Sequence, residues 1–233
     1  MKKLIIALIC ALSYSANIYA QKLPVIPIEG MPPYKIGATA GFNASSFSAS
    51  PYGYKAGFNV GIDFMLDASP LIKNTYLRTG LLLELKGASF DWDKVIRHRN
   101  PSVKFDYPIM NSATANVFYL EIPVNYGYAY SLTEDWILLG ETGPYIAIGL
   151  GGRISNPSPN ESSMPFYNHT VTYNNYEILS SPKRFDFGWD FAVGAMFLNK
   201  HQFKVGFQFG FLNVSNDFLQ NRNLSLGYSY FFE

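Results

Sequence analysis

The chain is almost without cysteine: its single one, Cys10, lies in an apolar segment close to the N-terminus. Beyond it, the absence of cysteine excludes a disulfide scaffold, a thiol nucleophile and a thiolate metal site. Charge of either sign is not in excess either, because the formal net charge is +1. The chain therefore lacks the basic surface that a nucleic-acid partner requires. After residue 20 no apolar run approaches the ~20 residues of a membrane-spanning helix.

The N-terminal segment has the organisation of an export signal. Lysines at positions 2 and 3 precede an apolar run over residues 4–12, and Ala20 supplies a small residue for cleavage. Cys10 lies within the apolar run, with more apolar sequence after it, so a lipid anchor at this cysteine is not expected. We predict a signal peptide over residues 1–20 and one domain over residues 21–233.

A period of two dominates the rest of the sequence. In residues 56–66, bulky apolar side chains occupy every second position, and glycine, asparagine, aspartate and methionine lie between them. This pattern is typical of a β-strand whose two faces meet different surroundings. We predict about eight such strands, each near the ~9–11 residues that cross a bilayer. They cover residues 35–45, 56–66, 77–86, 118–130, 136–153, 185–197, 203–211 and 224–232.

The size of an eight-stranded barrel indicates which face points inward. Its interior is only wide enough to be filled by side chains, and columns of Phe, Leu, Ile and Val from every strand would not fit there. A soluble, lipocalin-like barrel with these columns around a ligand is the alternative. We predict an all-β, eight-stranded, antiparallel transmembrane barrel with the apolar columns outside. The charged residues predicted to fill its interior are Lys35, Asp63, Arg78, Glu84, Lys86, Glu121, Glu141, Arg153, Asp186, Asp190 and Lys204.

The spacing between the predicted strands also alternates. Short connections follow the second, fourth and sixth strands, whereas residues 91–115 and 155–184 form long ones. Outer-membrane barrels have short periplasmic turns and longer extracellular loops. Aromatic residues such as Trp92, Tyr130 and Trp136 lie near strand ends, where an interfacial girdle is expected.

Seven segments along the predicted domain carry a further signal: GFNASSF (41–47), GFNVGIDF (57–64), LRTGLLLELKGASF (77–90), YLEIPVNY (119–126), GPYIAIGLGG (143–152), FDFGWDFAVGAMF (185–197) and LSLGYSYFF (224–232). These segments resemble the PorT-like outer-membrane β-barrel family of Gram-negative bacteria, and the resemblance runs the length of the predicted domain. It implies a barrel in the outer membrane, inserted by the assembly machinery from its C-terminal strand. The member that gives this family its name is linked to protein secretion. The resemblance carries over no catalytic residue.

The long connections contain the residues that could support other functions. His98 and His169 are candidate bases, with Asp91, Asp93, Ser162 and Ser163 near them in sequence, but no spacing forces the contacts that nucleophilic catalysis needs. We therefore predict no catalytic, cofactor or metal site. The leading hypothesis is a barrel with a sealed polar interior that presents loops 91–115 and 155–184 to a secretion complex or surface partner. A narrow porin-like channel and a rim hydrolase or acyltransferase remain as alternatives.

Overall fold

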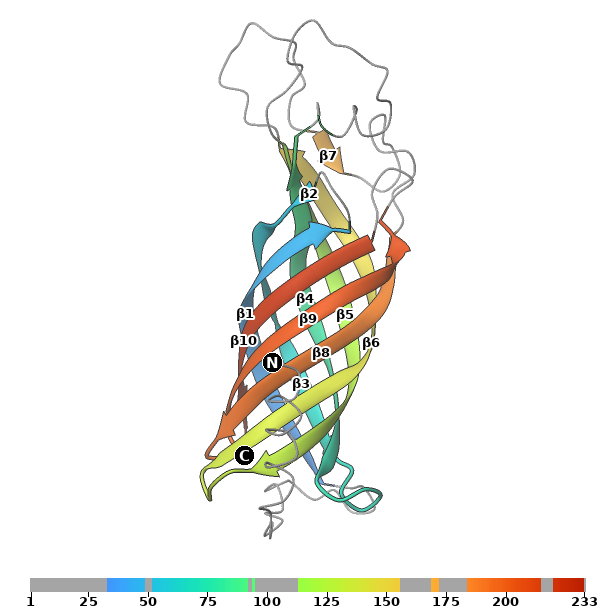
Figure 1. Ribbon diagram of the computed structural model, residues 1–233. Coiled ribbons are helices and arrows are strands. Elements are labelled where there is room, and N and C mark those ends of the chain that lie inside the picture. The colour runs from blue at the N-terminus through green and yellow to red at the C-terminus, as the bar shows by residue number, and fades with distance from the viewer. Residues whose placement is uncertain are drawn as a thin grey trace, which may run out of the picture.

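The computed structural model describes residues 33–48, 52–91, 94, 113–155, 169–171, 184–214 and 220–232. Eight long antiparallel strands close into a barrel (Figure 1), and two short strands pair with it. The barrel strands are β1 (Tyr34–Phe47), β3 (Lys55–Asp67), β4 (Thr75–Phe90), β5 (Ala113–Ser131), β6 (Trp136–Ser155), β8 (Phe185–Phe197), β9 (His201–Asn213) and β10 (Gln220–Phe231). The short strands are β2 (Tyr52–Gly53), which pairs with β4, and β7 (His169–Val171), which pairs with β6.

The barrel has a simple up-and-down topology. Consecutive long strands are hydrogen-bonded neighbours, and β1 pairs with β10 to close the cylinder, with Gly37 opposite Phe231. Closure leaves no barrel strand with an open edge, which is the condition for a sheet in lipid. All the predicted strands are confirmed, and most are longer than predicted; β5, for example, begins at Ala113 instead of Phe118.

The two ends of the barrel differ, as the spacing predicted. Residues 68–74, 132–135 and 198–200 form short turns at one end, which we call periplasmic on the general rule for such barrels. The long connections at the extracellular end lie mostly outside the described residues. At that end β4, β5 and β6 rise beyond β8, β9 and β10 (Figure 1), and β2 and β7 pair with this raised part. The predicted signal peptide, residues 1–20, also lies outside the described residues.

The apolar columns face outward, which confirms the orientation predicted from barrel size. Ile62 is 57% exposed, Val193 67% and Phe203 52%, whereas the residues between such positions are mostly buried. Rings gather on this face near the periplasmic end: Trp136 packs on Phe197 with ring centroids 4.8 Å apart. Trp92 lies outside the described residues. Within the described part of the chain, no helix is long and apolar enough to span a bilayer.

Glycine makes room for large side chains inside the barrel. A Cβ atom at Gly127 of β5 would lie 2.2 Å from Cζ of Tyr76, a fully buried residue of β4. The Tyr76 ring therefore lies against the Gly127 backbone, and its hydroxyl donates a 3.0 Å hydrogen bond to Oε1 of Glu141. The outward-facing Gly140 of β6 differs, because a Cβ there would meet nothing within 4 Å.

This contrast gives a paired prediction. Gly127→Ala is expected to lower the free energy of unfolding by about 1–3 kcal/mol, because the Tyr76 ring must leave its place and its bond to Glu141. Gly140→Ala is expected to be neutral or stabilising by up to about 1 kcal/mol, since the added methyl reduces chain entropy without a clash. Urea unfolding of the two variants in lipid vesicles measures both values. Equal effects would contradict the proposed Tyr76 packing.

Candidate functional site

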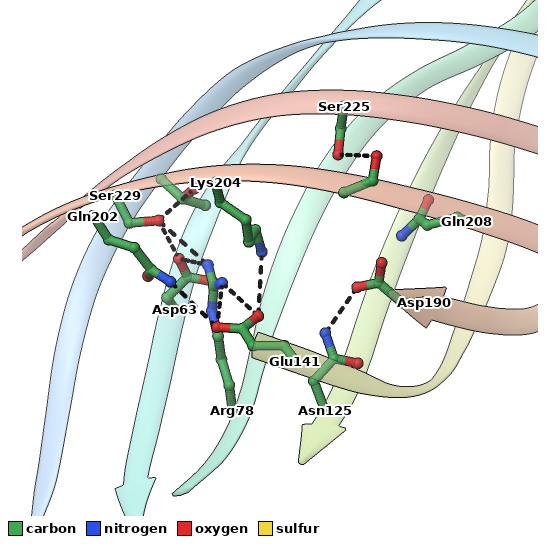
Figure 2. Close-up of polar contacts among 12 residues, drawn as sticks. Asp63, Arg78, Asn125, Glu141, Asp190, Gln202, Lys204, Gln208, Ser225 and Ser229 are labelled. Atoms are coloured by element: carbon green, nitrogen blue, oxygen red, sulfur yellow. Dashed lines mark hydrogen bonds and ion pairs between the residues drawn. The ribbon is translucent and has the colours of Figure 1, made fainter. Parts of the chain in front are cut away.

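The barrel interior is the candidate site, because alternation brings nearly all the charged strand residues into it. One group, here called the Arg78 cluster, is built on an ion-pair triad from β3, β4 and β6 (Figure 2). Arg78 Nη2 lies 2.5 Å from Asp63 Oδ2, and Nη1 lies 3.0 Å and 3.2 Å from the two oxygens of Glu141. All three residues are at most 5% exposed. One guanidinium thus joins two carboxylates across the lumen, using its planar fork of donors.

Four further polar residues complete the Arg78 cluster. Glu141 also accepts hydrogen bonds from Tyr76 and from Gln202 of β9, at 3.0 Å and 3.2 Å, and Lys204 Nζ lies 3.7 Å from its Oε2. On the other side, Ser229 Oγ of β10 lies 2.7 Å from Asp63 Oδ2. Two carboxylates therefore face two cations, so the formal charges of the cluster balance. A buried charge is tolerated when it is paired in this way.

A second group, here called the Lys86 cluster, lies farther along the same strands. Lys86 Nζ of β4 lies 3.0 Å from Glu84 Oε2 and 2.6 Å from Glu121 Oε2 of β5, and Gln208 of β9 bridges to both Lys86 and Glu121. Asn223 of β10 donates to Glu84 Oε1 at 2.7 Å. Lys86 and Glu121 are completely buried. These contacts again join opposite walls of the barrel.

Tyrosine rings enclose the Lys86 ammonium on its remaining side. Lys86 Nζ lies 4.6 Å from the ring centroid of Tyr145 and 5.8 Å from that of Tyr119. Tyr145 donates a 3.2 Å hydrogen bond to Asp186, which also accepts a 2.8 Å bond from Asn221. A cation held over a ring face in a dry site gains additional attraction. The Lys86 cluster therefore fills the full width of the lumen.

A small cavity of about 40 Å³ lies between the two clusters. Its walls include Asp190, which accepts a 2.7 Å hydrogen bond from Asn125, and Lys204. The Oδ1 atom of Asn125 is buried and has no protein partner. The volume admits a few water molecules, and this polar lining suits them.

Apolar side chains close the interior above and below the charged clusters. Toward the periplasm, the buried residues are Met65, Tyr76, Ile137, Leu139, Met196 and Phe231. Toward the extracellular end, they are Phe47, Ala88, Phe90, Ala113, Ala115 and Val214, with Tyr52 packed against them. We call these two groups of buried residues the apolar caps. The sequence predicted a sealed polar interior and did not identify them. Met65 and Phe231 each lie two residues along the strand from an inward-facing residue, Asp63 or Ser229. The alternation of faces was therefore the sequence signal that could have placed them inside the barrel.

The predicted interior charges are inward with one exception. Arg153 is exposed, and the prediction that it faces inward is wrong. In the β5–β6 ladder, Tyr119 lies opposite Gly149 but Phe118 lies opposite Gly151, so Leu150 is an extra residue in β6. One extra residue moves every later side chain to the other face. Lys35 is inward but joins neither cluster; its Nζ lies 2.8 Å from the carbonyl oxygen of Asn199 in a periplasmic turn.

Of the candidate residues in the long loops, the structure describes only Asp91 and His169. His98, Asp93, Ser162 and Ser163 lie outside the described residues. His169 begins β7, where its backbone pairs with Ile154, and Asp91 Oδ2 lies 3.9 Å from Lys94 Nζ. Among the residues that the structure describes, no group of three or more His, Cys, Asp or Glu is placed to hold a metal ion.

A closed cylinder with an apolar outer face and charges inside is a transmembrane β-barrel. The model of the outer membrane protein β-barrel domain family matches residues 19–216, and the chain belongs to this family. The protein is located in the outer membrane. This result agrees with the family resemblance at the level of the outer-membrane barrel.

Solved structures with a similar arrangement include two bacterial surface proteins. Ail, the attachment invasion locus protein of Yersinia pestis, is 12% identical with a TM-score of 0.36, covering 85% of this chain and 98% of that chain. Neisserial surface protein A is 11% identical with a TM-score of 0.42, covering 85% and 97%. An outer-membrane channel of Pseudomonas putida F1 is 12% identical with a TM-score of 0.26, covering 90% and 100%. A comparison with curated protein sequences gives no match.

Proposed function

We propose that this protein is a sealed outer-membrane barrel that presents its extracellular segments to a partner. The observation that carries the proposal is the filled lumen: two apolar caps enclose the Arg78 and Lys86 clusters. Between the clusters the described interior has a cavity of about 40 Å³. Ions passing through would have to displace paired, buried charges, which is costly. A structural or interaction role therefore fits this interior better than transport.

The raised side of the barrel supports the interaction role. β5 and β6 contain 19 and 20 residues, well beyond the ~9–11 that cross a bilayer. Their extracellular ends stand next to that of β4, with β2 attached to β4 and β7 attached to β6. Together they form a rigid wall from which the connections 91–112 and 156–184 begin. Binding segments supported by a rigid scaffold are a common arrangement in recognition proteins. The resemblance to PorT-like barrels makes a component of protein secretion the first partner to test.

The sealed interior predicts the electrical behaviour of the purified protein. Inserted into a planar lipid bilayer, it is expected to give no steady conductance, because the clusters join opposite walls of the lumen. A general porin in the same bilayer serves as the positive control, and folding is verified by heat-dependent gel mobility. Steady single-channel steps from the folded protein would replace this proposal with the narrow channel.

Partner binding is tested by crosslinking in intact cells. A variant with residues 156–168 replaced by a short Gly-Ser linker keeps every barrel strand and is the matched control. The natural chain is expected to recover a defined partner that this variant loses while its barrel remains folded. Identical crosslinking by both proteins would exclude the segment 156–168 from the interaction.

A further inference from the structure

The outer surface of the barrel has an uneven distribution of charge. Among the described strand residues that face outward, only Arg153 of β6 and Arg222 of β10 carry a charged side chain. Both lie toward the extracellular ends of their strands, and both are exposed. A third arginine, Arg184, directly precedes β8 but does not belong to this outer face. Its carbonyl oxygen accepts a 2.7 Å hydrogen bond from the amide of Gly149, which places it opposite a lumen-facing position.

Arg153 and Arg222 each end a column of lipid-facing side chains. On β10, Leu226 and Leu224 are 59% and 48% exposed, and Arg222 is the next outward residue. On β6 the apolar column ends at Leu150, which is 55% exposed. The bulge at Leu150 then turns Arg153 outward, although an unbroken alternation would have directed it into the lumen. The irregularity in β6 therefore adds a cation to the outer surface.

Arg153 and Arg222 lie on one side of the barrel and at different heights. The order β6, β8, β9, β10 is continuous in the sheet, so the arginines belong to one arc. Arg153 is near the extracellular end of β6 and Arg222 is near that of β10. At this end β6 rises beyond β10 (Figure 1). The described periplasmic turns differ, because they carry mixed charges: Lys73 in one, Glu134 and Asp135 in another, and Lys200 in the third. On the opposite extracellular side, Lys94 is paired with Asp91.

We propose that this arginine arc binds the phosphate groups of a glycolipid in the outer leaflet of the outer membrane. Three features of the described residues support this occupant. The arc borders the lipid-facing surface, the charges on the outer face of the strands are both cations near the extracellular end, and the strand that carries Arg153 rises beyond the one that carries Arg222. Arginine pairs with phosphate through two parallel N–H donors, and its aliphatic stem can lie along apolar surface. A headgroup with phosphates at several depths matches the staggered positions better than a phospholipid with one phosphate.

Lipid retention by the full-length protein tests the proposal. The detergent-solubilised protein is mixed with rough-type lipopolysaccharide bearing its phosphates, or with the same lipid after enzymatic dephosphorylation, and bound lipid is quantified by mass spectrometry. The natural chain is expected to retain the phosphorylated lipid roughly tenfold better than the dephosphorylated one. Excess inorganic phosphate is expected to compete poorly, because it lacks the acyl chains that lie on the apolar columns.

Substitutions test whether the two outward arginines are responsible for the retention of phosphorylated lipid. The double variant R153Q/R222Q is expected to lose roughly tenfold in retention of phosphorylated lipid, since each arginine near an anionic surface contributes several-fold. R153K/R222K retains the charge and should lose less. K73Q, in an exposed periplasmic turn, removes one positive charge elsewhere and should retain lipid like the natural chain. Heat-dependent gel mobility verifies that each barrel is folded.

Three results would overturn the assignment. Unchanged retention by the folded double variant would show that the arginines do not bind the lipid. Equal retention of phosphorylated and dephosphorylated lipid would show that phosphate is not recognised. An equal loss in K73Q would show that retention follows net charge instead of the arc. Because none of these measurements depends on conductance or on loop 156–168, they are independent of the proposed function.

Discussion

Arg78→Met is expected to destabilise the barrel by about 3–5 kcal/mol, which is a large part of the stability of an ordinary domain. The substitution removes the guanidinium that neutralises Asp63 and Glu141, with contacts of 2.5 Å and 3.0 Å. Both carboxylates stay buried at the centre of the lumen. Lys204 remains near Glu141 at 3.7 Å but no described cation other than Arg78 forms an ion pair with Asp63. Breaking a buried network by removing one partner costs much more than replacing the whole network.

Urea unfolding of the variant in lipid vesicles, followed by heat-dependent gel mobility, measures the loss. Arg222→Met is the matched control, because it makes the same chemical change on the outward face of β10. That variant is expected to remain within about 0.5 kcal/mol of the natural chain. If Arg78→Met unfolds at the same urea concentration as Arg222→Met, the Arg78 cluster does not have the structural role assigned to it.

Ile62→Arg is expected to cost about 2–4 kcal/mol, although Ile62 is 57% exposed in the isolated chain. Substitution of such an exposed residue in a water-soluble protein usually changes stability by less than about 0.5 kcal/mol. In a lipid bilayer the arginine would enter hydrocarbon, where its charge has no partner. Ile62 lies in the middle of β3, so its side chain cannot easily reach the polar boundary. The substitution therefore distinguishes a lipid-facing surface from a water-facing one.

Thr114→Arg is the control for this prediction. Thr114 is an outward position near the extracellular end of β5, in the raised part of the barrel, where it pairs with Ser89 and Ser155. An arginine there meets water or polar headgroups and is expected to be tolerated. Folding yield into lipid vesicles and the urea midpoint report the difference. If both variants insert and unfold alike, the apolar columns do not face hydrocarbon.

Much of the architecture follows from local pattern. The alternation identified every barrel strand, and the apolar columns identified the outward face, because each neighbouring pair of side chains on a strand must point to opposite sides. The connection lengths identified the two ends. These features depend only on positions along the chain, so one sequence was sufficient to predict them.

The arrangement of the interior could not be predicted in the same way. Arg78 meets Glu141 across 63 positions of sequence, and Lys86 meets Gln208 across 122. Which side chains meet across the lumen depends on the tilt and stagger of all the strands together. The bulge at Leu150 changed the face of Arg153, and no local feature predicted it. The histidine candidates of the long loops gave no arrangement that can be tested on the described residues.

For this protein, the sequence by itself determined a membrane barrel, its strands and the outward direction of its aromatic columns, because side-chain alternation is a property of each strand alone. Only the tertiary structure decided that the lumen is filled by two ionic clusters between apolar caps, and that an arginine arc borders the lipid on one side. Those features depend on the register of non-neighbouring strands, which is set when the cylinder closes.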